Sequence, residues 1–210
     1  MDGRRASGFV LFSIAAMQRL PHHFLTMAFN NAWANHRLLA AVSQLSQEDF
    51  VARRTSFFPT LKGTLNHILT VDWYYVDALE RSLAGREVDT DAHRRCFDPE
   101  EPMATIAEVT TAQRAVDRRL LDVCKGLTDE RLDTSVAIQR PHGVVHERCD
   151  RVLAHLFEHQ IHHRGQAHAM LAGTAVAPPQ LDEFFCEGDL ELRAKDFADL
   201  GFREEEIWRG

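Results

Sequence analysis

Hydrophobic positions recur with helical spacing in four long segments of the chain. Between residues 21 and 45, apolar side chains return every three or four positions, and Asn31 and Asn35 interrupt the stripe. The same spacing predicts further helices over residues 60–84, 103–125 and 150–172. Such spacing gathers the apolar residues on one face, which must pack against other helices. The pattern therefore predicts an all-α protein built as a four-helix bundle.

Residues that favour helix ends agree with these boundaries. Pro21 suits the first turn of a helix, and Thr60 suits the capping position before the second long segment. Gly85 and Gly126 follow the second and third segments, where glycine commonly ends a helix. Pro178-Pro179 interrupts the chain after the fourth segment. These signals predict four separate helices joined by loops.

The remaining segments carry weaker patterns. We expect a short helical turn after Ser46, a charged and irregular loop over residues 86–101, and one short helix in the tail from residue 182. Residues 133–148 alternate around Pro141-His142-Gly143, which predicts a hairpin.

The chain divides into a predicted central domain and two flanking segments. These are an N-terminal extension over 1–20, a metal-binding bundle over 21–185 and an acidic C-terminal tail over 186–210. The extension holds an apolar run at residues 8–17 after two arginines, which suggests either a short signal peptide or an extended start before Met17. The run is too short to span a bilayer. We expect a cytoplasmic protein without a membrane span.

Composition narrows the class of protein further. The formal net charge of the 210 residues is -7, and no basic stripe is evident, so we expect no nucleic-acid partner. The four cysteines lie far apart without a CxxC pair, which argues against a disulfide framework or a zinc ribbon. The twelve histidines are numerous for this length, and five of them fall between residues 155 and 168. That cluster points to a metal site.

Three histidines have the spacing and surroundings expected of metal ligands. His159 and His163 lie one helical turn apart on one face, so both imidazoles can reach a single ion. His67 lies on the inward face of the second helix, although a single histidine in that position is more often a hydrogen-bonded core residue. Three imidazoles suit one divalent ion of zinc, nickel, iron or copper, and zinc is the commonest. They leave a fourth coordination position for water or substrate, as in catalytic zinc sites.

His155 and Glu158 are candidates for proton transfer beside this metal. His155 extends the face of His159 by one turn, so it could instead line the pocket or support a ligand. The run His155-Leu-Phe-Glu158-His159 also matches H-x-x-E-H, a zinc-protease signature. A short, acidic, helical chain without a substrate-binding sheet argues against that protease function.

Four further residues are candidates for a substrate pocket. Trp33, Trp73 and Tyr74 could line it, although plain core packing is the alternative for each. Arg164 could bind a substrate carboxylate, or it could pair with an acidic neighbour.

Four motifs carry a resemblance to a known family. They are W-A-N-x-R-L from residue 33, G-T-L-N-H-I-L over 63–69, H-x-x-H-H-R-G-Q over 159–166 and P-P-x-L-D over 178–182. In this order the chain resembles the DinB/YfiT-like family of proposed metalloenzymes, over about residues 24–185. The extension before residue 20 and the long acidic tail depart from the family pattern. So does Glu158, which stands where many relatives have asparagine.

The resemblance implies more than the residues alone. It implies an up-down-down-up bundle topology and a metal on His67, His159 and His163. It also implies homodimers, and a low-molecular-weight thiol as cosubstrate in transfer or isomerisation reactions.

Two classes of function follow from these expectations. The first is a metal-dependent, thiol-dependent S-transferase or hydrolase that acts on a small molecule. The second is a non-catalytic metal-binding or stress-response bundle, and a bundle without metal is a third possibility. An open fourth coordination position favours the enzyme, whereas a protein side chain in that position favours the second class.

Overall fold

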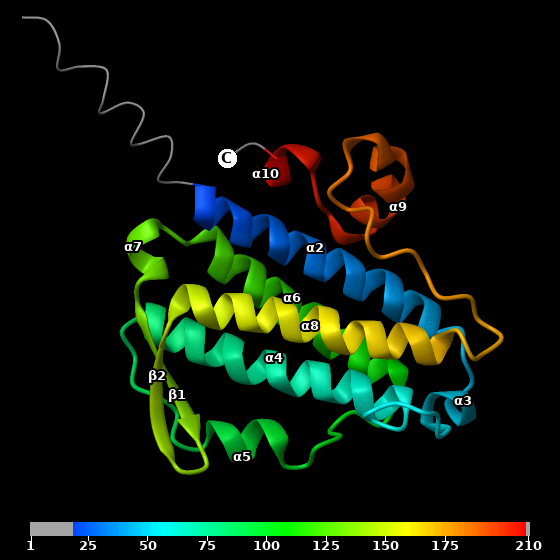
Figure 1. The fold of residues 1–210 in the computed structure, drawn as a ribbon, viewed down its shortest axis with the longest axis horizontal. Helices are drawn as coiled ribbons and strands as arrows, with labels where there is room; N and C mark the ends of the chain where they lie inside the picture. Colours follow the sequence, from blue (N-terminus) through cyan, green and yellow to red (C-terminus); the bar gives the residue numbers. More distant parts are fainter. Residues whose placement is uncertain (1–18, 209–210) are drawn as a thin grey trace, which may run out of the picture.

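Four long helices form the centre of the structure, a computed structural model that describes residues 19–208. They are α2 (Arg19–Val42), α4 (Leu61–Leu83), α6 (Ile106–Lys125) and α8 (Cys149–Leu171). Helices α2 and α4 each pack against both α6 and α8. In Figure 1, α2 and α8 run in one direction and α4 and α6 run in the other. The prediction of a mostly helical protein is confirmed, and none of the described helices is long and apolar enough to cross a membrane.

Shorter elements join and cover the long helices. They are α3 (Gln47–Val51), α5 (Ala92–Phe97), α7 (Asp129–Leu132), β1 (Ser135–Arg140), β2 (Gly143–Arg148), the 3₁₀ helix η1 (Glu187–Asp189), α9 (Leu190–Leu200) and α10 (Glu204–Trp208). The strands β1 and β2 form the antiparallel hairpin that the sequence predicts. Val136 and Ile138 of β1 are buried, whereas β2 is largely exposed. The hairpin therefore attaches to the helices through β1.

Capping side chains fix the N-terminal ends of α4 and α6. The Thr60 hydroxyl accepts a hydrogen bond from the Gly63 N–H, which caps α4 as predicted. Thr105 and Glu108 form a capping box, so α6 begins at Ile106 rather than at the expected residue 103. Gly85 adopts a φ of 63°, the left-handed conformation that glycine adopts without steric cost.

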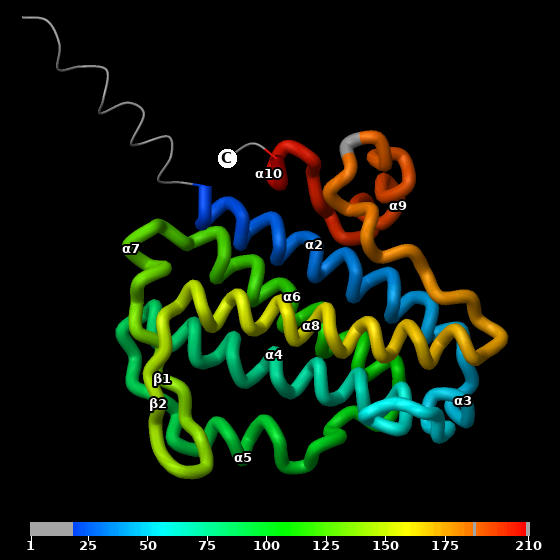
Figure 2. The backbone as a smooth tube through the Cα atoms, viewed as in Figure 1, coloured from blue at the N-terminus to red at the C-terminus, as the bar shows by residue number. Residues whose placement is uncertain are grey.

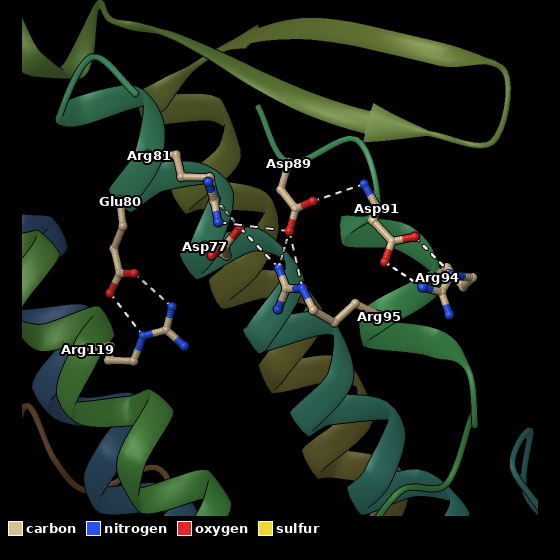
Figure 3. A network of polar contacts seen from close by, with 8 residues as sticks. All are labelled: Asp77, Glu80, Arg81, Asp89, Asp91, Arg94, Arg95 and Arg119. Carbon is tan, nitrogen blue, oxygen red and sulfur yellow. Dashed lines mark hydrogen bonds and ion pairs between the residues drawn. The ribbon is translucent and has the colours of Figure 1, made fainter. Parts of the chain in front are cut away.

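Helix α5 lies in the segment over 86–101, where we expected an irregular loop. Figure 3 shows that ion pairs connect it to α4. Arg95 of α5 lies 2.7 Å from Asp89 and 3.4 Å from Asp77 of α4. Arg81 also lies 2.8 Å from Asp77. A single exposed pair contributes little free energy, but a network that shares its carboxylates restricts how α5 can sit.

The C-terminal segment packs onto α2, as Figure 2 shows for α9 and α10. The Trp33 indole N–H of α2 donates to Asp196 at 3.2 Å, and Phe184 packs against the indole ring. Phe197 and Ile207 belong to the same hydrophobic cluster as the long helices. The segment contains η1, α9 and α10, which is more helix than the single short one expected from the sequence. The N-terminal extension lies outside the described residues except for its last two positions.

A group of buried polar side chains lies between the four long helices, and we call it the polar core. Its members are Asn31 and Asn35 of α2, Asp72 of α4, Gln113 and Asp117 of α6, and Gln160 and Arg164 of α8. It lies where two hydrophobic clusters meet. Along α8, for example, one cluster ends at Phe157 and the other begins at Ala167.

Amide side chains connect the charged members of the polar core. The Arg164 guanidinium donates to the side-chain oxygens of Asn31 and Asn35 at 2.6 and 2.9 Å. Asn35 in turn donates to Asp117 at 3.0 Å. Gln113 donates to Asp72 at 2.7 Å and to Asp117 at 3.0 Å. Each long helix thus contributes at least one partner to the network.

Burial changes the proton affinity of these groups. It raises the pKa of Asp72 to about 7. Burial, with the nearby charge of Asp72, raises the pKa of Asp117 to about 8. Burial also lowers the pKa of Arg164 to about 10. Desolvation disfavours the charged form in all three cases.

Loss of the buried cation should destabilise the protein strongly. We expect Arg164→Met to lower the free energy of unfolding by about 3 kcal/mol, because it leaves the buried side-chain oxygens of Asn31 and Asn35 without their donor and removes the positive charge near Asp72 and Asp117. Urea denaturation followed by circular dichroism measures this change. Arg118→Met is the matched control on the exposed face of α6, and we expect it to stay within about 0.5 kcal/mol of wild type. Equal losses in both variants would contradict the importance of the polar core.

The raised pKa of Asp117 predicts a pH dependence of stability. An unfolded aspartate has a pKa near 3.9, so between about pH 4 and pH 8 the native state binds more protons than the unfolded state. The stability contributed by Asp117 is therefore present below that window and is lost as the pH rises through the folded pKa of about 8. We expect the stability of Asp117→Asn, which resembles the protonated form, to rise by about 4 kcal/mol relative to wild type between pH 5 and pH 9.

Urea denaturation at the two pH values measures this difference. The exposed Asp122→Asn change on the same helix is the control, and it should stay within about 0.5 kcal/mol of wild type at both. A constant difference between Asp117→Asn and wild type would show that Asp117 keeps an ordinary proton affinity in the folded protein.

Candidate metal centre

The structure brings His67, His159 and His163 together between α4 and α8. One ring nitrogen from each lies within 4.8 Å of the others. The Nε2 atoms of His67 and His159 are 3.0 Å apart. His159 and His163 share a face of α8 because they are one turn apart, and α8 packs directly on α4. These three residues could hold a metal ion, and they are the ones that the sequence selects.

Neighbouring side chains orient and shield the three imidazoles. The Nδ1 atom of His163 lies 2.9 Å from the Gln166 side-chain oxygen, so it carries the proton and leaves Nε2 free as a ligand. The Phe58 ring covers the other side of the cluster, with its centroid 4.4 Å from that of His67 and 5.7 Å from that of His163. His163 is itself buried.

The imidazoles are neutral at physiological pH. Burial, with repulsion from His163, lowers the pKa of His67 to about 4. Burial, with repulsion from the surrounding histidines, lowers the pKa of His159 to about 3. Burial also lowers the pKa of His163. Metal ions bind neutral imidazole, so the cluster needs little proton release before it binds one.

The donor set fits a divalent transition metal. Three neutral nitrogen ligands suit zinc, nickel, iron or copper, whereas magnesium and calcium prefer oxygen. The two Nε2 atoms of His67 and His159 face each other at a short distance. A metal ion bound by both atoms would take a lone pair from each of them.

A pocket of about 410 Å³ adjoins His67. It is lined by residues from the loop before α4, from α4, from α5 and the loop after it, and from the end of β1: Phe58, Gly63, His67, Thr70, His93, Phe97, Glu100, Glu101 and Arg140. The ion-pair network of Figure 3 holds α5 on α4, so it also fixes the positions of His93 and Phe97 in this wall. The cluster thus has a space beside it in which a small molecule fits.

The two residues expected to transfer protons lie near the cluster but outside it. His155 is exposed, and its ring centroid lies 6.1 Å from that of His159 and 5.2 Å from that of Tyr75. Glu158 is exposed on α8, and its carboxylate makes no hydrogen bond or ion pair with another residue in 19–208. An H-x-x-E-H zinc site would use His155 and His159 as its two histidine ligands. The histidine cluster of this structure contains His159 and His163 instead, so it does not form that site.

The four expected pocket residues lie away from the lining of the pocket beside His67. Trp33 contacts the C-terminal segment, and Arg164 belongs to the polar core. Trp73 packs partly buried against the main hydrophobic cluster. Tyr74 is buried, and its hydroxyl donates to the Gln139 carbonyl of the hairpin.

Several lining residues escape the sequence analysis. Phe58 lies in a loop and His93 in a short segment without recurring spacing, whereas Arg140 lies in the predicted hairpin but next to its turn. Their signal is weak because α5 is six residues long and β1 is exposed at its end. One signal could identify Arg140 as a residue on the same strand face as the buried side chains: it follows Val136 and Ile138 at every second position of the predicted strand.

The fold and the site define a mostly helical protein with a three-histidine cluster able to bind a metal. Sequence comparison gives its family: the model of the DinB family matches residues 17–190, and the chain belongs to this family. It is similar to Protein DinB of Bacillus subtilis (strain 168), with 24% identity over 151 residues that cover 70% of this chain and 85% of the relative. It is also similar to the uncharacterized protein YizA of the same organism, with 27% identity over 123 residues that cover 59% and 70%.

Proposed function

We propose that this protein is a metal-dependent enzyme that acts on a small molecule, as a transferase or hydrolase, with one divalent ion on His67, His159 and His163. One observation carries the proposal: three neutral imidazoles meet beside a pocket of about 410 Å³. Among the described residues, no fourth histidine, cysteine or carboxylate joins the group. That favours an open coordination position, and hence an enzyme over a closed metal-binding protein.

The residues around the cluster have separable roles in this proposal. A divalent ion bound there supplies Lewis acidity and lowers the pKa of a water or thiol that it binds. Gln166 holds His163 in the tautomer that leaves Nε2 free, and Phe58 keeps bulk water from one side of the cluster. His155 is exposed beside His159, and we assign it the exchange of protons with solvent.

Several finer points are part of the same proposal. Zinc is the proposed ion because it is the commonest metal with imidazole ligands of this kind. Family membership supports a low-molecular-weight thiol as cosubstrate, a homodimer and a cytoplasmic protein. The up-down-down-up bundle is supported by the directions of α2, α4, α6 and α8 in Figure 1.

Removal of two ligands should abolish metal binding. We expect purified wild type to contain about one metal ion per chain, and His159→Ala/His163→Ala to contain almost none while it remains folded. Elemental analysis gives the metal content, and circular dichroism verifies the fold. The control His146→Ala/His162→Ala removes two exposed histidines and should keep the metal.

Two outcomes separate the alternatives. Wild type that binds no metal, even after incubation with zinc or nickel, would overturn the proposal. A protein that binds metal but transfers or hydrolyses nothing in a screen of thiols and small electrophiles would instead be the non-catalytic metal-binding bundle.

The contact between Gln166 and His163 gives a second test of the ligand geometry. We expect Gln166→Leu to weaken zinc binding about 10- to 100-fold, because the His163 ring loses the partner that fixes its tautomer. Competition with a chelating dye measures the affinity. Gln166 also contacts His162 at 3.0 Å, so His162→Ala is the control and should leave the affinity unchanged. If both variants bind zinc like wild type, Gln166 does not orient the ligand.

A further inference from the structure

We propose that Arg140, at the end of β1, binds a carboxylate group of the substrate in the pocket beside His67. Arg140 and His67 both line this pocket, although the hairpin and α4 are separated by more than fifty residues in the sequence. The inference extends the proposed function by naming the class of substrate, and it rests on that function.

Arg140 is solvent-exposed at the end of β1, and its contacts with the rings of Tyr74 and Tyr75 place its guanidinium beside α4. Alternate residues of a strand share one face, and Val136 and Ile138 are both buried, so Arg140 is in phase with them. Two hydrogen bonds hold this part of the strand on α4. The Ala137 N–H donates to the Ser82 hydroxyl at 3.1 Å, and the Tyr74 hydroxyl donates to the Gln139 carbonyl. Arg140 is therefore presented by a fixed strand end.

The guanidinium of Arg140 retains free donors. One N–H donates to the Tyr75 hydroxyl at 2.8 Å. The guanidinium carbon lies 5.7 Å and 5.6 Å from the ring centroids of Tyr74 and Tyr75, which support the cation without neutralising it. Within residues 19–208, no carboxylate lies within ion-pair distance of Arg140. Arginine has five N–H donors, so enough remain to bind a carboxylate with two parallel hydrogen bonds.

The other residues of the pocket favour one negative charge over two. Glu100 and Glu101 also line it. Lys62 lies 3.0 Å from Glu101, so these two side chains form an ion pair with each other. Two glutamates in the same pocket repel a dianionic phosphate more than a singly charged carboxylate. Phe58 and Phe97 give the pocket apolar walls. The favoured ligand thus has an apolar middle and a single carboxylate at the end that Arg140 binds.

The first experiment uses the cobalt-loaded protein and a series of ω-mercapto-carboxylates of three to six carbons. Each is compared with the mercapto-alcohol of equal length, through the absorption band that sulfur forms with cobalt. We expect the best-fitting carboxylate to bind wild type about tenfold more tightly than its alcohol, as a charge-assisted hydrogen-bond pair allows. In Arg140→Gln this preference should fall to about twofold or less.

Two further variants make the result specific. Arg118→Gln removes the same charge from the exposed face of α6, and it should keep the tenfold preference. Arg140→Lys keeps the charge but not the planar fork, so it should retain an intermediate preference. Thermal unfolding of each variant verifies that it folds. If Arg140→Gln does not fold, the comparison of wild type with Arg140→Lys decides.

A second experiment does not depend on a metal. Binding of benzoate, benzyl alcohol and phenyl phosphate to the metal-free protein is followed by NMR. We expect wild type to prefer benzoate over both others, and Arg140→Gln to lose that preference.

Failure of the protein to load cobalt, with benzoate binding intact, would count against the metal proposal alone. Equal binding of benzoate and benzyl alcohol, tighter binding of phenyl phosphate, or an unaffected Arg140→Gln would overturn the carboxylate assignment.

Discussion

A guanidinium that is almost fully removed from water must have its hydrogen bonds satisfied inside the protein. Arg164 meets this requirement through Asn31 and Asn35 of α2, and amide groups extend the connection to the carboxyls of α4 and α6. A sliding of any long helix along its axis would remove at least one of these bonds. Apolar contacts are non-directional and tolerate such sliding, so the polar core sets the register of the four helices.

The same register determines whether the histidines meet. On α8, Gln160 and Arg164 each follow a cluster histidine by one residue, so the bonds that fix their rotation also fix His159 and His163. On α4, Asp72 lies five residues after His67 and accepts a hydrogen bond from Gln160 of α8. The histidine cluster and the polar core therefore occupy neighbouring faces of the same helix pair, and the polar core aligns the cluster before any ligand binds.

Sequence patterns were sufficient for the long helices and for the pair His159 and His163, because helical spacing is local and the two histidines lie within one turn. His67 also needed its place on an inward helix face and the family motif G-T-L-N-H-I-L. They were insufficient for α5, whose position depends on ion pairs with α4, and for the pocket, whose wall combines α4, α5 and β1. An inward-facing polar or aromatic residue is also ambiguous in sequence. Arg164 and Trp33 both face inward. Arg164 donates hydrogen bonds within the polar core, whereas Trp33 contacts the C-terminal segment.

The packing of the C-terminal segment on α2 also constrains how the chain folds during synthesis. Phe29 and Trp33 of α2 are covered by aromatic residues near positions 184 and 202, which leave the ribosome more than 150 residues later. Until then, this part of α2 lacks its C-terminal aromatic cover, and the apolar surface left exposed favours aggregation. Truncated translation products would keep that surface exposed, which makes them natural clients for chaperones and proteases.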